Sequence, residues 1–356
     1  MKIIHCSDIH LGASMRTHLN LEQAKTRQIE LLTTFSKMID YAVENKIGAI
    51  IIAGDLFDTD ECTNKTRDFL LANINQASKV EFFYLAGNHD ENNVIKQSEL
   101  PKNLHIFGAS WTTFDFDGIK ITGSTLPNKN IYHELNLNSE DFNIVVLHGQ
   151  EDYSPLSDKP DTVFIEELKN KNIDYLALGH IHTFNLKELD KRGVMCYSGC
   201  LEGRGWDECG KKGFVLLDIE ERKLTTKFVP FGERTLHEFS VDVSDLNSTQ
   251  DVINHISNLT CDIPSKDFVR VVLTGKVEAN HSLSPKLIKS KFDYKFFCFE
   301  VKDKTTIKVD IEKYKLDVSL AGEFVRNVEA CTLNQDEKDE IINLGLKILN
   351  GEEVEL

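Results

Sequence analysis

Five short polar segments of this 356-residue chain carry eight side chains that can bind metal ions or transfer protons. They are Asp8, His10, Asp55, Asn88, His89, His148, His180 and His182. Imidazole, carboxylate and amide groups suit manganese, iron or zinc, and no segment contains the thiolates of an iron–sulfur or Cys-rich zinc centre. The pattern predicts a site for two metal ions. Ions about 3.5 Å apart need a shared ligand, and we assign this bridge to the carboxylate of Asp55.

Each polar segment follows a run of apolar residues that is typical of a buried strand. The runs are KIIHCS, AIIIA, EFFYLA, NIVVL and DYLAL, which are rich in β-branched and aromatic residues. Parallel strands bring their carboxyl ends to one edge of a sheet, where ligands bind in α/β folds. Glycines precede Asp55, Asn88 and His180, and we expect them to let the backbone turn sharply out of each strand.

The order of the motifs DxH, GDxxD, GNHD, H and GHxH resembles that of the calcineurin-like metallophosphoesterase superfamily. Within it, the opening MKIIHCSDIHLG and the later YSGCLEGRGWDE resemble DNA repair nuclease subunits of the SbcD and YhaO type. The resemblance is close over roughly the first two thirds of the chain and holds only in outline beyond. It implies an α/β (α+β) fold, namely a four-layer β-sandwich flanked by helices, with a small α/β capping domain.

The resemblance also implies a role for each polar side chain. It assigns one metal ion to Asp8, His10, Asp55 and His182, and the other to Asp55, Asn88, His148 and His180. It leaves His89 to face the scissile phosphate, where this residue would protonate the leaving oxygen or stabilise the developing charge. Mn²⁺ is the metal we expect first, with iron and zinc as alternatives.

Position 58 separates this chain from part of the family. Archaeal and eukaryotic members carry a second histidine three residues after the bridging aspartate, where this chain has Asp58. A carboxylate beside His89 would raise its pKa and hold its tautomer, so we expect Asp58 to assist His89 in catalysis. The alternative is that Asp58 only caps a helix around residues 63–76. For Asp90, a turn-stabilising hydrogen bond is the expected role.

Residues 1–232 are predicted to form the metallophosphoesterase (nuclease) domain. A helical pattern over residues 21–46 predicts a core-facing stripe of Ile29, Leu32, Phe35, Met38, Ile39, Ala42 and Val43. Crossover helices are expected between parallel strands up to about residue 182. Segments 104–123 and 184–230 are expected to add antiparallel strands that complete a second sheet.

The pattern changes after residue 232. Strands are predicted at 236–243, 268–275 and 294–301, with helices near 249–259 and 284–291 between them. This β-α-β-α-β unit, within residues 233–320, matches in outline the capping, DNA-binding domain of the resembling nucleases. Residues 321–356 are predicted to form a C-terminal helical segment that starts at Asn334, with Glu337 three residues on. It either packs on its own domain or docks on a partner.

Composition bears on location. No stretch approaches eighteen consecutive apolar residues, and the N-terminus lacks the pattern of a signal peptide, so we expect a cytoplasmic protein without membrane contact. The eight scattered cysteines are typical of reduced thiols. Cys196, Cys200 and Cys209 lie near one another, but they lack a CxxC pair and a clear fourth ligand, so no third metal site is expected.

The charge of the chain gives opposing signals about nucleic acid. Its 41 basic and 57 acidic residues leave a net charge of −16, which repels phosphate backbones. Residues 266–310, however, contain ten basic and six acidic residues, with Lys286, Lys289, Lys291 and Lys295 close together. These lysines form either a DNA-contacting surface or a solvated helix face.

Together these features predict a metal-dependent DNA exonuclease or endonuclease of DNA repair that hydrolyses phosphodiester bonds with metal-activated water. The resemblance implies DNA and an SMC-type, SbcC-like ATPase as partners, and it is compatible with a homodimer. One alternative is a phosphodiesterase or phosphatase for nucleotides or other small phosphate esters, which would be far less sensitive to salt. Another is a DNA-tethering subunit with incidental hydrolysis.

Overall fold

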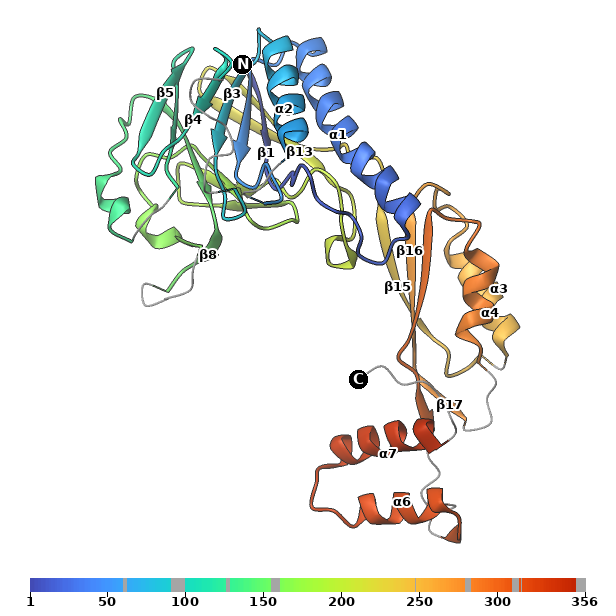
Figure 1. Cartoon of the computed structure of the whole chain (residues 1–356). Helices are drawn as coiled ribbons and strands as arrows, with labels where there is room; N and C mark the ends of the chain where they lie inside the picture. The colour runs from blue at the N-terminus through green and yellow to red at the C-terminus, as the bar shows by residue number, and fades with distance from the viewer. Residues whose placement is uncertain are drawn as a thin grey trace. The chain divides into compact units, whose positions relative to one another are not determined.

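The computed structural model divides the chain into two compact units, Met1–Leu236 and His237–Leu356, shown in Figure 1. It describes residues 1–59, 63–90, 100–125, 129–154, 161–246, 248–278, 283–308, 314 and 316–349. Each unit has its own hydrophobic clusters. No helix among the described residues is both long and apolar enough to cross a membrane.

The first unit contains two mixed six-stranded sheets. Across the first sheet the strands are β14 (Lys223–Pro230), β13 (Gly213–Glu220), β1 (Lys2–Cys6), β2 (Ala49–Ala53), β3 (Glu81–Leu85) and β4 (Leu104–Ile106). Across the second they are β11 (Asn185–Glu188), β12 (Val194–Tyr197), β10 (Tyr175–Gly179), β7 (Phe142–His148), β6 (Ile119–Gly123) and β5 (Thr112–Phe116). β1 to β4 are parallel, as are β6, β7, β10 and β12.

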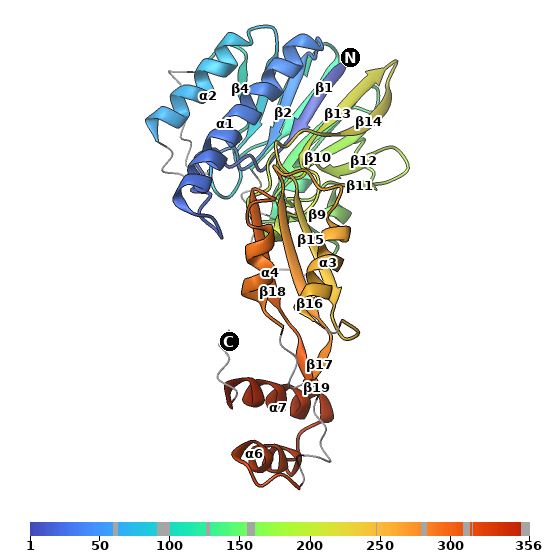
Figure 2. The same cartoon turned by 90° about the vertical axis from the view of Figure 1, so that its right-hand side faces the viewer.

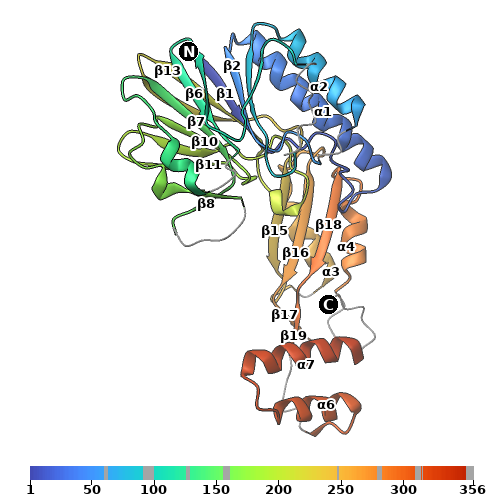
Figure 3. The same ribbon diagram turned by 60° about the vertical axis from the view of Figure 1, so that its left-hand side comes forward.

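The two sheets pack face to face through apolar side chains. Ile3, Ile51 and Phe83 of the first sheet and Ile144 and Tyr175 of the second belong to one buried cluster. Helices α1 (Leu21–Glu44) and α2 (Asn64–Gln76) lie side by side over the other face of the first sheet (Figures 2 and 3). The outer face of the second sheet packs on two short 3₁₀ helices, η2 (Lys129–Glu134) and η3 (Ile165–Glu167). The predicted α/β fold of two sheets flanked by helices is confirmed.

Helix α1 begins at a capping box formed by Asn20 and Gln23. The Asn20 side chain accepts hydrogen bonds from the backbone N–H groups of Glu22 and Gln23, and the Gln23 side chain accepts one from the Asn20 backbone. The buried residues are Ala24, Arg27, Leu31, Thr34, Phe35, Met38, Ile39 and Ala42. The predicted stripe was wrong at its ends, because Ile29 is 65% exposed and Val43 is 49% exposed. The buried Arg27 occupies the core-facing position in the turn where Ile29 was expected.

Two further expectations about the first unit were wrong. Strands β4, β13 and β14 belong to the first sheet, because β4 pairs with β3 and β13 pairs with β1. The connection from β7 to β10 contains no α-helix in its described residues; it contains the small parallel pair β8 (Gln150–Asp152) and β9 (Thr162–Phe164), followed by η3. A short 3₁₀ helix leaves little periodic signal in the sequence, which is why a crossover helix was expected there.

The second unit begins with the predicted β-α-β-α-β order. Its sheet contains β15 (Leu236–Asp242), β16 (Phe268–Thr274) and β18 (Cys298–Asp303), with α3 (Thr249–Leu259) and α4 (Pro285–Phe292) packed on it. The third strand starts four residues later than expected, because Tyr294 to Phe297 lie in a turn. The short strands β17 (Lys276–Glu278) and β19 (Thr306–Lys308) form an additional parallel pair.

The C-terminal part of the second unit is a pair of helices that lie side by side, α6 (Leu320–Glu329) and α7 (Gln335–Leu349) (Figures 1 and 3). Val325 and Val328 of α6 form a separate buried cluster with Ile342 and Leu346 of α7. The predicted start of the last helix is confirmed, because the Asn334 side chain accepts from Glu337 N and the Glu337 side chain accepts from Asn334 N.

Candidate metal centre

The polar segments predicted from the sequence leave the strands at the same edges of the two sheets. Segments following the parallel strands β1, β2 and β3 carry Asp8, His10, Asp55, Asn88 and His89. In the second sheet, His148 ends β7, and His180 and His182 follow its parallel neighbour β10. Among the described residues, three groups of side chains from these segments are close enough to hold a metal ion, and none contains a cysteine.

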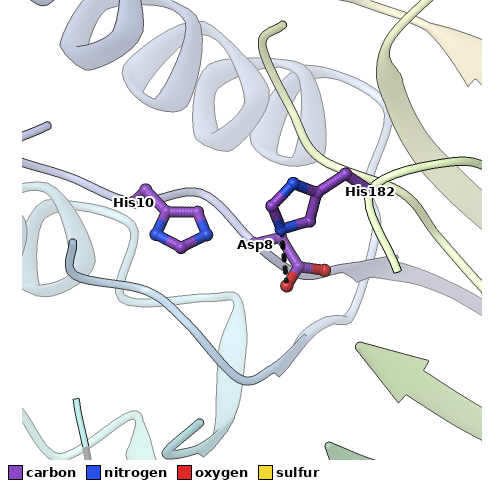
Figure 4. A group of neighbouring side chains, drawn as sticks. All are labelled: Asp8, His10 and His182. Atoms are coloured by element: carbon purple, nitrogen blue, oxygen red, sulfur yellow. Dashed lines mark ion pairs between the residues drawn. The ribbon is translucent and has the colours of Figure 1, made fainter. Parts of the chain in front are cut away.

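The first group contains Asp8, His10 and His182. Figure 4 shows the His182 ring directed at the Asp8 carboxylate, with His182 Nε2 3.6 Å from Asp8 Oδ1 and the His10 ring beside the pair. The Asp8 carboxylate is oriented by Ser7 Oγ, 2.5 Å from Oδ2, and by the backbone N–H of His180, 3.0 Å from Oδ1. Asp8 and His10 are buried and His182 is partly exposed. The oxygen and nitrogen atoms therefore surround a space that is open on one side.

The second group is centred on Asp55 and His148. Asp55 Oδ2 lies 3.4 Å from His148 Nε2 and 3.7 Å from His10 Nε2, so this one oxygen faces histidines of both predicted metal positions. Asn88 Oδ1 lies 3.0 Å from His148 Nε2 and 3.2 Å from His180 Nδ1. The structure thus brings together the four side chains predicted for the second ion, with Asp55 between the two sets.

The donor atoms fit two divalent ions. The buried Nε2 of His10 has no hydrogen-bond partner among the described residues. An unsatisfied buried polar group costs about 1–3 kcal/mol, which a bound cation at Nε2 would offset. Burial lowers the pKa of His10, so its ring is neutral and has a lone pair to donate. The mixed imidazole, carboxylate and amide set suits manganese, iron or zinc.

His89 and Asp58 lie at the edge of this centre. His89 is exposed, and its ring Nδ1 is 3.0 Å from the backbone carbonyl of Asp58. The Asp58 carboxylate instead lies 3.3 Å from His10 Nδ1 and 3.1 Å from Arg204 Nη1. These contacts, first that of His10, lower the pKa of Asp58. Asp58 does not cap α2, whose N-cap is Thr63. Assistance to His89 through the carboxylate stays a prediction.

The sequence interpretation did not single out Arg204 and Glu208. Glu208 ends the 3₁₀ helix η4 (Trp206–Glu208), and its Oε1 lies 2.6 Å from His182 Nδ1. Burial would raise the pKa of Glu208, but His182 and Arg204 lower it to about 2. Both residues lie in the segment YSGCLEGRGWDE, where a cluster of charges beside glycines was the available signal.

Asp90 has the structural role that was expected of it. It is fully buried and accepts hydrogen bonds from the backbone N–H groups of Leu56, Phe57 and Gly87 and from the Tyr84 hydroxyl. These bonds join the segment after β3 to the segment after β2. Asp90 therefore fixes the loops from which Asp55, Asn88 and His89 project.

The backbone around the centre is unusual at the ligand positions themselves. Asp8, His10, Asp55 and His180 have φ values of 51°, 52°, 49° and 98°, in the left-handed region that costs about 1–3 kcal/mol for such residues. Gly87 serves close approach, since a Cβ there would lie 2.2 Å from Asp55 Oδ1. Gly54 combines both needs, with φ of 90° and a Cβ position 1.9 Å from His148 Nδ1. Part of the turning that we expected of the glycines is thus done by the ligand residues.

Comparison with known proteins identifies this arrangement. The family model for calcineurin-like phosphoesterases matches residues 1–184, just over half of the chain. The chain belongs to the calcineurin-like phosphoesterase family. Members of this family typically use a dinuclear metal site, and the three groups of candidate ligands all lie within the matched residues.

Three curated relatives of this phosphoesterase are distant. It is 25% identical to the uncharacterized metallophosphoesterase YhaO of Bacillus subtilis over 77% of this chain and 72% of the relative. It is 24% identical to the DNA double-strand break repair protein Mre11 of Sulfurisphaera tokodaii, over 77% and 74%. It is 26% identical to the SbcD component of the nuclease SbcCD of Staphylococcus saprophyticus, over 65% and 69%. The similarity therefore extends well beyond the matched family segment.

The pair of Asp55 and His148 makes the metal-free phosphoesterase sensitive to pH. Burial alone would lower the pKa of His148, but Asp55 and Asp8 raise it from 6.5 to about 9. Because the folded-state pKa exceeds the unfolded one, the protonated pair stabilises the metal-free fold fully below about pH 6.5. This stabilisation, on the order of 3 kcal/mol, is lost as the pH rises through about 9.

We therefore expect the melting temperature of chelator-treated protein to fall between pH 6.5 and 9. Ion binding needs a neutral His148, so the stabilisation by added Mn²⁺ should grow over the same range. Thermal unfolding with and without Mn²⁺ measures both trends. The variant His148→Gln has no titrating ring, and its metal-free form should lose this pH dependence. Equal pH dependence in the variant and the wild type would contradict the assignment.

Proposed function

We propose that the protein is a metal-dependent DNA nuclease that hydrolyses phosphodiester bonds in DNA repair. The observation that carries the proposal is the convergence of carboxylate, imidazole and amide groups from five strand ends on one centre. The DNA substrate is supported by two distant relatives, one named a DNA double-strand break repair protein and the other part of a nuclease.

In this proposal one ion is held by Asp8, His10, Asp55 and His182, and the other by Asp55, Asn88, His148 and His180. We propose Mn²⁺, with iron or zinc as alternatives. When bound, two such ions act as Lewis acids on the phosphate and lower the pKa of water. The buried Asp55 supplies the negative charge between the two positions.

His89 is the proposed proton donor. Its Nδ1–H donates to the Asp58 carbonyl, which fixes the orientation of the ring and leaves Nε2 to meet the leaving oxygen. The exposure of His89 allows a long substrate to reach it. Asp58 is proposed to support His89 through its carbonyl and its negative charge, while its carboxylate contacts His10.

A basic surface on the second unit supports a DNA substrate. Lys286, Lys289 and Lys291 on and beside α4 are exposed, and so is Tyr294, whose side chain is 98% exposed. Cations attract the phosphate backbone, and an exposed aromatic ring can stack on bases. Lys295 does not belong to this surface, because its Nζ donates to the carbonyl and hydroxyl oxygens of Thr260.

We further propose an SMC-type, SbcC-like ATPase as the partner. One relative is named as a component of a nuclease, SbcCD. The C-terminal helix pair and the residues before it leave large apolar side chains exposed, which is typical of a partner surface. These are Leu316, Val318, Leu320, Leu333, Ile341, Ile348 and Leu349. A homodimer stays a prediction.

One observation favours a small phosphate ester as substrate. A cavity of about 410 Å³ lies beside the centre, lined by Ser14, Met15, Asp58, Arg204 and Glu208 among others. This volume falls in the range of small-molecule sites, and Arg204 could pair with a phosphate group. The second candidate is therefore a phosphodiesterase or phosphatase for nucleotides or similar esters.

The two candidates differ in their response to salt. The purified protein with Mn²⁺, with and without the ATPase, is assayed on end-labelled duplex DNA, single-stranded DNA and small phosphodiesters at about 50 and 200 mM salt. A nuclease should prefer DNA and slow steeply with salt, because binding releases counterions. Preferential turnover of the small esters, with little effect of salt, would favour the second candidate. DNA binding without turnover would indicate a tethering subunit.

A further inference from the structure

Arg204 joins two carboxylates that come from distant parts of the first unit. Its Nη1 donates to Asp58 Oδ1 at 3.1 Å, and its Nη2 donates to Glu208 Oε1 at 3.1 Å. The Arg204 backbone N–H also donates to Glu208 Oε2 at 2.6 Å. The Arg204 side chain is 21% exposed and that of Glu208 is 4% exposed, so the bridge is shielded from solvent. Planar, permanently charged guanidinium groups are suited to holding two carboxylates at fixed angles.

Each of these carboxylates meets the outward nitrogen of a histidine. Asp58 Oδ1 lies 3.3 Å from His10 Nδ1, and Glu208 Oε1 lies 2.6 Å from His182 Nδ1. The other nitrogen of each ring faces a carboxylate of the centre, with His10 Nε2 3.7 Å from Asp55 and His182 Nε2 3.6 Å from Asp8. Both rings are thus arranged to donate Nδ1–H outward and to present Nε2 inward, and both belong to the same proposed metal position.

We propose that Arg204 is a positioning residue for one of the two metal ions, acting through Asp58 on His10 and through Glu208 on His182. The inference rests on the proposed metal centre and not on the DNA substrate. Partners that receive the second N–H of a metal-binding histidine fix its tautomer and ring orientation. Here one guanidinium holds both partners, so His10 and His182 are oriented as a pair.

The sign of the expected effect separates positioning from simple electrostatics. A fixed positive charge beside a cation site repels the cation, so charge alone predicts tighter binding when Arg204 is removed. Positioning predicts weaker binding, because losing such a partner typically reduces metal affinity about 10–100-fold. Arg204→Met should therefore weaken one Mn²⁺ site by about 10–100-fold and leave the other unchanged. Arg204→Lys should weaken the same site, since it keeps the charge but not the planar fork.

Arg192→Met is the matched control. The Arg192 side chain is 26% exposed and is bound to Asp174, much as Arg204 is bound to its carboxylates. Arg192 precedes β12, which runs parallel to β10, so it lies at the sheet edge opposite the segment of His180 and His182. This variant should lose stability but bind both ions as the wild type does.

The test is titration of the metal-free full-length protein with Mn²⁺, followed by electron paramagnetic resonance and equilibrium dialysis, without any substrate. Thermal unfolding checks that each variant is folded. If Arg204→Met does not fold, Arg204→Lys and Glu208→Gln carry the same expectation of one weakened site. Two sites of unchanged or increased affinity, or equal weakening of both, would overturn the proposal. Wild-type protein that binds two ions but leaves DNA intact would refute the nuclease function alone.

Discussion

Asp55→Asn is expected to prevent binding of the two-ion centre and to slow phosphodiester hydrolysis by about 10³-fold or more, because two-metal chemistry is worth several kcal/mol. Asp55 is 2% exposed, and its Oδ2 lies between His148 and His10, which belong to different proposed ion positions. The amide has nearly the same size and can still accept the hydrogen bond of the His89 backbone N–H. What it lacks is the negative charge that both ions share.

Asp174→Asn is a suitable control for this variant. The Asp174 side chain is 15% exposed and pairs with Arg192, away from the strand ends that carry the proposed ligands. Metal analysis after dialysis against Mn²⁺ and single-turnover rates should show two ions and normal hydrolysis in the control. If Asp55→Asn also kept two ions and a normal rate, the assignment of Asp55 as the bridge would be wrong.

His89→Ala is expected to keep both ions and DNA affinity while losing on the order of 10²- to 10⁴-fold in rate. The reason is that His89 lies outside the proposed ligand sets, with Nδ1 bonded to the Asp58 carbonyl. A general acid acts in the transition state, where the alkoxide leaving group of DNA needs a proton. Rates and metal content are measured on the same preparation.

The leaving group provides an internal check on the role of His89. A nitrophenyl phosphodiester releases a stable anion that needs little protonation, so with it the loss should shrink to within about tenfold. His133→Ala, which changes another exposed histidine, should have no effect with either substrate. An equal loss with both substrates would indicate that His89 acts on the phosphate and not on the leaving group. A loss of metal would make it a ligand.

The strands and the gathering of the candidate ligands could be predicted because their signals are local. Asp8, Asp55 and His148 each follow or end an apolar run, and parallel strands place such positions on one edge. The register of α1 could not be predicted in full, since a buried arginine replaced an apolar residue on its core-facing side. Arg27 is tolerated there because it pairs with Glu202 and Glu30, which are 175 and 3 positions away.

The roles of Arg204 and Glu208 could not be predicted for a similar reason. Arg204 and Asp58 are 146 positions apart, and their contact depends on how the loop after β12 folds over the segment after β2. Charges in a glycine-containing loop are usually solvated, and sequence spacing gives no distance to a histidine on another loop. The same limit applies to the Asp58 side chain, whose nearest histidine nitrogen in the structure belongs to His10.

The central position of β1 has a consequence for how the protein is made. His5 of β1 pairs with Val215 of β13, so the two positions are 210 residues apart. At a translation rate of about 5–20 residues per second, β1 leaves the ribosome roughly 10–40 s before that partner. During this interval one edge of an apolar strand is unpaired, which invites contact with other nascent chains. We therefore expect the yield of folded protein to depend on translation speed and on chaperones that shield β1.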